Sequence, residues 1–384
     1  MHGSQVERLI QIINSGIGSG GAETDSLHQS WRAACRRDTV ARPALFVGTG
    51  TCGLGAGAAK TLAAVRAFLA ARGLEADIVE VGCIGLCAEE PMLDLQLPGR
   101  TRLSFKEVAA DRVERLLAQA LAGEPPLDMV VAQFRSPVLT PWAGVRFMDE
   151  HPFFAPQKRW VLANCGVLDP TSIEEYVAHG GYQALAKTLR AYTRQEVCDL
   201  VERSGLRGRG GGGFQTGTKW KYALRAESEQ KYLICNADEG DPGAFMDRAV
   251  IEGDPHRLVE GMAIAAYAIG ASQAYVYIRA EYPLAIRRLV HALDQARACG
   301  LIGESILDSG VNLEVKIKQG AGAFVCGEET ALIHSIEGRR GMPRPRPPFP
   351  AVRGLFGRPT VINNVETLAN LPAILSHGAE WFSA

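Results

Sequence analysis

The segment YLICNADEGDPG, residues 232–243, joins an apolar strand to an acidic turn. Residues 232–235 carry no charge, and a strand that is apolar throughout is typical of a parallel sheet covered on both faces. The run 274–278 has the same character and follows a long apolar helix that we expect to begin at Asp254-Pro255. This alternation of strands and helices predicts an α/β domain with a parallel sheet.

The turn after the first strand carries Asn236, Asp238, Glu239 and Asp241. Ligands of open α/β sheets bind beyond the carboxyl ends of the strands, so these side chains are candidates to accept hydrogen bonds from sugar or ribityl hydroxyl groups. A hard-cation site is the alternative, although the run is too short to wrap a calcium ion.

A glycine-rich loop, RGRGGGGF at 207–214, lies between a helix that begins with the capping box 193–196 and a helix expected from about Thr216. Consecutive glycines let backbone N–H groups converge, and Arg209 and Lys219 add positive charge, so the pattern predicts a phosphate cradle. It is neither a Walker loop nor the simple dinucleotide fingerprint, because no Gly-Lys-Ser/Thr follows and a helix precedes it. Taken alone, the motif leaves open a flexible linker or an RGG-type RNA contact.

Residues 320–330 form a second turn into an expected helix, with Glu328 and Glu329 in its first turn. The helix dipole favours acids at this place in any protein, so either glutamate alone has a structural explanation. Asn363 and Asn364 mark a third polar turn.

The amino-terminal part predicts a separate thioredoxin-like layer structure with the order βαβββα. The expected elements are strands at 44–47, 76–81, 93–97 and 101–105 and helices at 56–71 and 108–122. Glycine and prolines at 123–126 break this pattern. We therefore expect an amino-terminal helix and loop at 1–40, the thioredoxin-like domain at 41–125, a connecting segment at 126–165 and the larger α/β domain at 166–384.

Composition excludes several classes of protein. The 41 basic and 42 acidic residues leave a net charge of -1, which argues against bulk attraction to nucleic acid or an anionic membrane.

The first 14 residues do not resemble a secretory signal. The apolar window 258–278 contains Glu260 and Gln273 and is expected to be a buried helix followed by a strand, not a membrane span. We expect a cytoplasmic protein with reduced thiols and no membrane insertion.

Together the motifs resemble the flavin-bearing, NADH-oxidising subunit of respiratory complex I and its relatives in NAD-linked hydrogenases and formate dehydrogenases. The matching runs are 208–214, 236–248, 320–330, 343–350 and 363–367. The resemblance implies FMN and NAD as cofactors and hydride transfer from nicotinamide C4 to flavin N5, with binding and orientation left to the protein. It implies no general acid or base. It also favours a nucleotide-lining loop over a polyproline ligand for residues 339–350.

The resemblance also implies site residues. It places FMN on Gly208, Arg209, Gly210, Gly211, Lys219, Asn236, Asp238, Glu239, Gly327, Glu328, Asn363, Asn364 and Thr367. It places NAD on Phe214, Asp241, Phe324, Glu329, Arg346 and Phe349. Glu329 would repel a 2′-phosphate, which favours NAD over NADP. The chain departs from the family at Gln215, where proline is usual, at Phe324, where tyrosine is common, and at Arg346, where lysine is frequent.

Cys52, Cys83 and Cys87 resemble part of a thioredoxin-like [2Fe–2S] domain, whose pattern is Cys-x₄-Cys and then Cys-x₃-Cys. Val47 stands where the first cysteine belongs, and such a cluster normally takes four thiolates. We expect an emptied, structural domain, with a cluster on three cysteines and a foreign ligand as the alternative. Cys35 is a remote candidate for the missing ligand. The remaining cysteines are expected to be small buried residues. The family's carboxyl-terminal [4Fe–4S] segment is not expected in this chain.

The expected function is that of a flavin-dependent NADH:acceptor oxidoreductase. It would exchange hydride between NAD(H) and FMN and pass electrons to iron–sulfur subunits of a soluble formate dehydrogenase or hydrogenase complex. The alternatives are an inactive assembly subunit that retains the flavin fold and, more remotely, an RNA-binding protein that uses the Arg-Gly loop.

Overall fold

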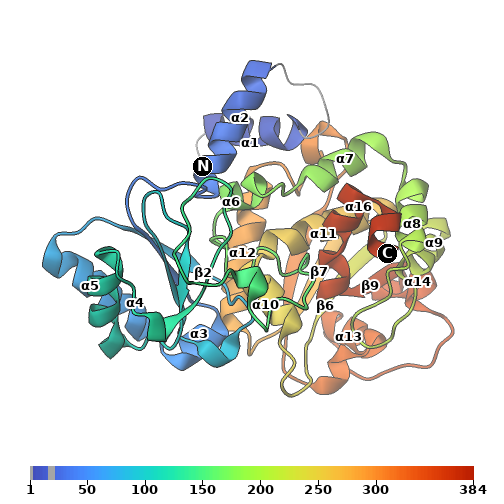
Figure 1. Ribbon diagram of the computed structural model, residues 1–384. Coiled ribbons are helices and arrows are strands. Elements are labelled where there is room, and N and C mark those ends of the chain that lie inside the picture. Colours follow the sequence, from blue (N-terminus) through green and yellow to red (C-terminus); the bar gives the residue numbers. More distant parts are fainter. Residues whose placement is uncertain (1–2, 16–21) are drawn as a thin grey trace. The chain divides into compact units, whose positions relative to one another are not determined.

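The computed structural model describes residues 3–15 and 22–384 (Figure 1). Contacts divide the chain into two compact units. The small unit comprises residues 26–178, and the large unit comprises residues 179–384 with the described part of residues 1–25. The predicted α/β class is confirmed in both units.

The small unit contains a five-stranded sheet in the order β2-β1-β3-β4-β5. The strands are β1 (Ala44–Gly48), β2 (Asp77–Val81), β3 (Leu93–Gln96), β4 (Leu103–Phe105) and β5 (Val130–Gln133). β1 and β2 are parallel, whereas the other pairs are antiparallel. The four expected strands and the two expected helical regions are present in the expected order, and β5 extends the sheet into the segment that was expected to be a connection.

The helices of the small unit are α3 (Thr51–Ala56), α4 (Ala58–Arg72), α5 (Val113–Leu121) and α6 (Ile173–Ala178), and α2 (Ala22–Cys35) leads into the unit. Of these, α4 and α5 cover the sheet with apolar side chains. The single helix expected at 56–71 is divided into α3 and α4 at Gly57. The φ of Gly57 is 110°, a conformation that residues with a β-carbon do not adopt easily. Leu62 and Val65 of α4 and Leu116 of α5 join Leu45 and Leu95 of the sheet in one core.

The large unit is built on a four-stranded, fully parallel sheet in the order β8-β7-β6-β9. The strands are β6 (Tyr232–Ala237), β7 (Gln273–Arg279), β8 (Glu314–Gly320) and β9 (Thr360–Asn364). Its helices are α1 (Gly3–Ser15), α7 (Gln183–Ala191), α8 (Arg194–Arg203), α9 (Thr216–Arg225), α10 (Met246–Gly253), α11 (Pro255–Ile269), α12 (Pro283–Ala298), α13 (Glu329–Ile336), α14 (Pro350–Arg353), α15 (Val365–Ala369), α16 (Leu371–His377) and α17 (Ala379–Ser383).

The apolar strands of the large unit are buried as their composition requires. Leu332 and Ile333 of α13 pack with Ile234 of β6 and Tyr277 of β7, and α11 contacts the same two strands. The window 258–278 contains most of α11 and nearly all of the strand β7, which confirms the expected buried helix and strand. Within the described part of the chain, no helix has the length and apolar character needed to cross a bilayer.

Candidate functional site

Two neighbouring parallel strands of the large unit carry asparagines at or next to their carboxyl ends. In the β6–β9 register Asn236 lies opposite Asn364, and Cys235 lies opposite Asn363. The Asn236 side chain donates to the Gly327 carbonyl at 2.9 Å, and Asn364 caps α15 by accepting a hydrogen bond from the Thr367 N–H at 3.1 Å. Parallel pairing therefore brings three polar turns that are distant in sequence to one edge of the sheet.

A cavity of about 900 Å³ opens at this edge, within the size range of small-molecule and cofactor sites. The lining contains many of the residues predicted from the sequence, namely Gly208, Gly210, Phe214, Lys219, Asn236, Gly327, Glu328, Glu329, Arg346, Phe349, Asn363 and Asn364. The structure thus brings together the glycine loop, both strand ends and the proline-rich loop.

Other lining residues were missed by sequence reasoning. They are Tyr222, Ala351, Val352, Thr360 and Ile362, whereas Gly212 and Gly213 belong to the predicted glycine loop and Pro350 to the predicted nucleotide-lining loop. Tyr222 follows Lys219 by three positions on α9, and this helical spacing was a usable signal. The apolar members carried no comparable signal, because only the folding of the proline-rich loop against β9 exposes them to the cavity.

The remaining predicted residues do not line the cavity. Thr367 Oγ accepts a hydrogen bond from the Arg209 N–H at 2.9 Å and thereby ties the glycine loop to α15. Glu239 accepts from the N–H groups of Asp247 and Arg248, so its carboxylate caps α10. Asp241 is exposed on its turn and Gly211 lies within the glycine loop. Phe324 is 69% exposed and packs on Gly240, where an added β-carbon would lie 2.7 Å from the ring.

Asp238 lies directly behind the cavity wall. A β-carbon on the lining residue Gly327 would be 3.7 Å from the Asp238 Oδ2 atom. That oxygen is buried and has no hydrogen-bond partner among the described residues. Burial also raises the pKa of Asp238. A buried polar atom without a partner is costly, so this oxygen indicates a ligand that donates a hydrogen bond.

The glycine loop is folded back on itself. The Gly208 N–H donates to the Phe214 carbonyl at 2.9 Å, and Gly211 and Gly213 have φ values of 96° and 60°. A β-carbon on Gly210 would lie 3.1 Å from the β-carbon of Asn364. Absence of side chains therefore lets the loop backbone approach the end of β9 and leaves the cavity open to a phosphate group.

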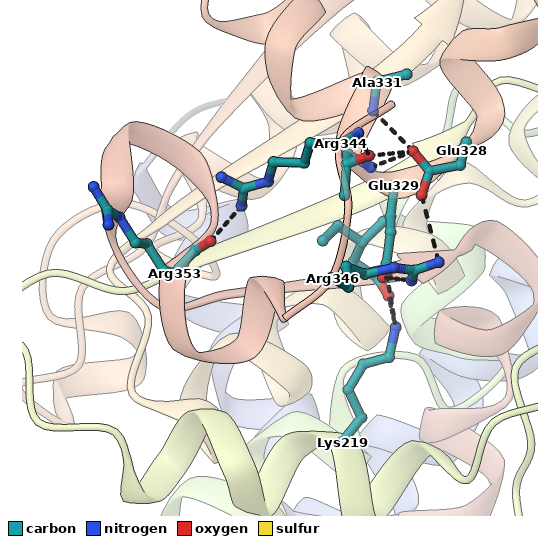
Figure 2. A network of polar contacts seen from close by, with 9 residues as sticks. Lys219, Glu328, Glu329, Ala331, Arg344, Arg346 and Arg353 are labelled. Atoms are coloured by element: carbon teal, nitrogen blue, oxygen red, sulfur yellow. Dashed lines mark hydrogen bonds and ion pairs between the residues drawn. The ribbon is translucent and has the colours of Figure 1, made fainter. Parts of the chain in front are cut away.

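Charged side chains form a network along one side of the cavity (Figure 2). Lys219 Nζ donates to the Ile362 carbonyl at 2.7 Å and lies 3.7 Å from a carboxylate oxygen of Glu329. Arg346 pairs with Glu329 at 2.5 Å and with Glu328 at 3.9 Å. Burial lowers the pKa of Lys219, and the nearby Glu329 opposes that shift. The network holds two cations at the cavity, where a bound phosphate would compete with Glu329 for them.

Glu328 has a second role at the start of α13. One of its carboxylate oxygens accepts hydrogen bonds from the N–H groups of Thr330 at 2.9 Å and Ala331 at 3.0 Å. In Figure 2 this carboxylate lies between the first turn of α13 and the Arg346 guanidinium. The position of Glu328 is therefore set by the helix cap as well as by charge.

The small unit contains the three cysteines of the degenerate pattern. Their sulfur atoms all lie within 4.8 Å of one another. Val47 is fully buried in the apolar core with Leu45. Cys35 lies beside the carboxylates of Glu174 and Glu175, and it is not a member of the cysteine group. The suggestion that Cys35 replaces the missing ligand is therefore wrong.

Comparisons with known proteins agree with this site. Residues 201–373 match the family model described as the Nuo51 FMN-binding domain. The chain is 62% identical over 227 residues to the HndC component of an NADP-reducing hydrogenase of Solidesulfovibrio fructosivorans, covering 59% of this chain and 46% of that protein. It is 55% identical over 222 residues to a component of an NADH-quinone oxidoreductase of Rhizobium meliloti, covering 58% of this chain and 53% of that protein.

Among solved structures, an NAD⁺-reducing [NiFe]-hydrogenase in the H₂-reduced state is similar, with a TM-score of 0.51 and 29% identity. That match covers 94% of this chain and 58% of the other. The chain spans about half the length of the curated relatives it matches. The matched segment contains the glycine loop, the ends of β6 and β9 and the charged network described above. Residues 201–373 are therefore similar to the FMN-binding domain of the complex I flavoprotein family.

Proposed function

We propose that this chain is the electron-input module of a larger oxidoreductase, exchanging hydride with NAD(H) at FMN held in the cavity of the large unit. The observation that carries the proposal is the cavity itself. Its lining combines a folded glycine loop and a lysine, and a buried carboxylate oxygen without a partner among the described residues lies behind its wall, all within a segment that matches an FMN-binding family model. When bound, FMN supplies the acceptor for two electrons and a route to partners that take them singly.

The residues present fit a flavin nucleotide. The N–H groups of the glycine loop and the ammonium group of Lys219 suit its phosphate. The Asp238 oxygen, which lacks a partner among the described residues, suits a ribityl hydroxyl or a ring N–H group. Asn236 and Asn364 hold the surrounding turns in place through their own hydrogen bonds. These groups bind and orient, and we assign no proton transfer to any of them.

Two aromatic rings at the cavity suit the flat rings of a nicotinamide nucleotide. Phe214 is 53% exposed and Phe349 is 57% exposed, although both line the cavity. A stacked ring would cover this apolar surface and exclude water from the reacting face. Glu329 at the same cavity disfavours a 2′-phosphate by charge repulsion, so we propose NAD(H) in preference to NADP(H). The name of one relative, which belongs to an NADP-reducing hydrogenase, makes this preference worth testing directly.

The electrons would leave through iron–sulfur subunits of the same complex. The relatives are named as parts of a hydrogenase and of NADH-quinone oxidoreductases, and the similar structure is a hydrogenase. We propose a soluble formate dehydrogenase or hydrogenase complex in the cytoplasm as the assembly. An inactive assembly subunit that keeps the flavin fold is the alternative outcome of the experiment below.

The experiment is anaerobic titration of the FMN-reconstituted chain with NADH. Flavin absorbance should bleach with one NADH per FMN, and ferricyanide should restore it. A chain that cannot be reconstituted with FMN overturns the flavin proposal. A chain that binds FMN but is not bleached by NADH identifies the inactive assembly subunit.

A further inference from the structure

We propose that Cys52, Cys83 and Cys87 form a site for one soft divalent cation of the zinc class, with three thiolate ligands and an open fourth position, and not a [2Fe–2S] site. The proposal concerns the small unit only and does not rest on the flavin function of the large unit.

The distances between the sulfur atoms support a single-ion site. Cys87 Sγ lies 3.5 Å from Cys83 Sγ and 3.4 Å from Cys52 Sγ, and all three atoms lie within 4.8 Å of one another. A tetrahedral zinc ion with Zn–S bonds of about 2.3 Å separates its sulfur ligands by about 3.8 Å. The three sulfurs thus lie near the corners of one tetrahedron.

The fold explains why these cysteines converge. β1 and β2 are parallel neighbours, and Gly48 at the end of β1 lies opposite Val81 at the end of β2. Cys52 follows β1 in the first turn of α3, and Cys83 follows β2. The turn that leads to Cys87 is closed by the Gly85 N–H, which donates to Cys83 Sγ at 3.3 Å. Such N–H···S bonds stabilise a thiolate.

A four-thiolate cluster does not fit the same residues. A [2Fe–2S] cluster takes four thiolates shared between two irons. Among the residues that the structure describes, the group contains three cysteines and no fourth metal-binding side chain within reach of all of them. Position 47 holds a buried valine, and Cys35 lies beside two carboxylates elsewhere in the unit. The disagreement with the family pattern therefore removes one of the two thiolates of one iron and leaves a compact set of three cysteines.

The surroundings of the three thiols offset negative charge. Arg159 donates to the Ile84 carbonyl at 2.9 Å, and its guanidinium interacts electrostatically with the Cys83 thiol. Three thiolates and one divalent cation carry a net charge of -1, which this guanidinium balances. Glu90 also borders Cys83, but its carboxylate accepts the Met92 N–H at 2.8 Å and is not within 4.8 Å of all three sulfurs.

The test uses the full chain, reduced without thiol reagents under anaerobic conditions, and Co²⁺ alone as the first probe. We expect one Co²⁺ per chain, with sulfur-to-cobalt charge-transfer bands and the intense visible bands of tetrahedral coordination, and displacement of Co²⁺ by one Zn²⁺. Separate incubation with ferrous iron and sulfide should leave no stable cluster. Stable binding of two irons and two sulfides per chain overturns the proposal, and so does failure to bind Co²⁺.

Variants assign the ligands. The variants Cys52→Ser, Cys83→Ser and Cys87→Ser should each remove about one third of the charge-transfer intensity per bound Co²⁺, because each removes one of three thiolates. Cys35→Ser is the matched control and should leave the spectrum unchanged. Arg159→Met should weaken Co²⁺ binding by about tenfold or more without altering the charge-transfer bands, as expected for a residue next to a metal ligand. If a serine variant fails to fold, the wild-type stoichiometry and spectrum still decide the question.

Discussion

At the scale of single residues, Asp247 is a buried acid that holds the cavity-lining residue Asn364 in place. Its carboxylate accepts hydrogen bonds from the Asn364 amide at 2.7 Å and from the Glu366 N–H at 3.4 Å. Burial, assisted by the nearby Glu239, raises the pKa of Asp247 to about 7. The folded protein therefore holds this proton more tightly than the unfolded chain does.

This raised pKa predicts a pH dependence of stability. Between about pH 4 and pH 7 the folded state binds more protons at Asp247 than the unfolded state, so the free energy of unfolding contributed by this group falls as pH rises. Asp247→Asn should flatten that slope, measured by urea denaturation at several pH values between 4.5 and 7.5. Comparison with wild type at each pH cancels other groups, such as His256, whose pKa burial lowers to about 4. Asp294→Asn on the exposed side of α12 is the control, and an unchanged slope in Asp247→Asn would contradict the assignment.

Lys219 and Lys221 lie two positions apart on α9 and have different surroundings. Lys219 lines the cavity, whereas Lys221 pairs with Asp199 at 2.6 Å and with Glu202. Lys219→Met should weaken FMN binding roughly 10- to 100-fold, the size of a lost charge-assisted hydrogen bond of about 1.5–3 kcal/mol. Fluorescence titration with FMN measures the effect. Lys221→Met should bind FMN as wild type does, and equal loss in both variants would show that Lys219 acts only on stability.

The negative charge of Glu329 predicts a preference for NADH over NADPH. Its carboxylate pairs with Arg346, so Glu329→Gln both removes a negative charge and frees a guanidinium for a 2′-phosphate. The ratio of kcat/KM for NADPH to that for NADH should rise by about tenfold, or about 1.4 kcal/mol. The exposed Glu304→Gln is the control. No change in the ratio would remove Glu329 from nucleotide selection.

At the scale of elements, α13 depends on a glutamate cap. The Glu328 carboxylate accepts two N–H groups of the first turn, which an alanine cannot do. Glu328→Ala should lower the free energy of unfolding of the FMN-free chain by about 1 kcal/mol, the usual value of an N-cap. Glu328→Asp should retain most of that stability, because a shorter carboxylate still reaches the helix end. Equal unfolding midpoints for Glu328→Ala and wild type would contradict the capping role.

Local sequence signals predicted most elements because they act within a few residues. The capping box at Thr193 is present, with Glu196 Oε2 accepting the Thr193 N–H at 2.7 Å. Asp169-Pro170 has the residue types of a helix start, with aspartate as the N-cap and proline at the first helical position, but α6 begins only at Ile173. The Asp169 carboxylate instead accepts the N–H and hydroxyl groups of Thr171 in a local turn. The same side-chain chemistry serves a cap or a turn, and the following residues decide between them.

At the scale of the whole molecule, the two units should respond to different ligands. FMN at a hundred times its Kd should stabilise the large unit by about 2.7 kcal/mol. Hydrogen exchange measured by mass spectrometry should show protection in residues 208–219, 232–238 and 360–367 and none in residues 44–105. Riboflavin, which lacks the phosphate, is the matched control and should protect the glycine loop less. Protection of 44–105 by FMN would show that the flavin site extends beyond the large unit.

The sequence by itself determined the element types, the parallel sheet of the large unit and the glycine, lysine and asparagine side of the cavity. Each of these follows from short-range chemistry, such as apolar runs, capping residues and consecutive glycines. Only the tertiary structure decided which carboxylates already have hydrogen-bond partners and which remain available to a ligand. Glu239 is occupied by the cap of α10, and Asp238 retains an oxygen without a partner among the described residues, behind Gly327. Only the tertiary structure brought the three cysteines together as well. Strand pairing between distant segments determines which side chains meet and which polar groups already have hydrogen-bond partners.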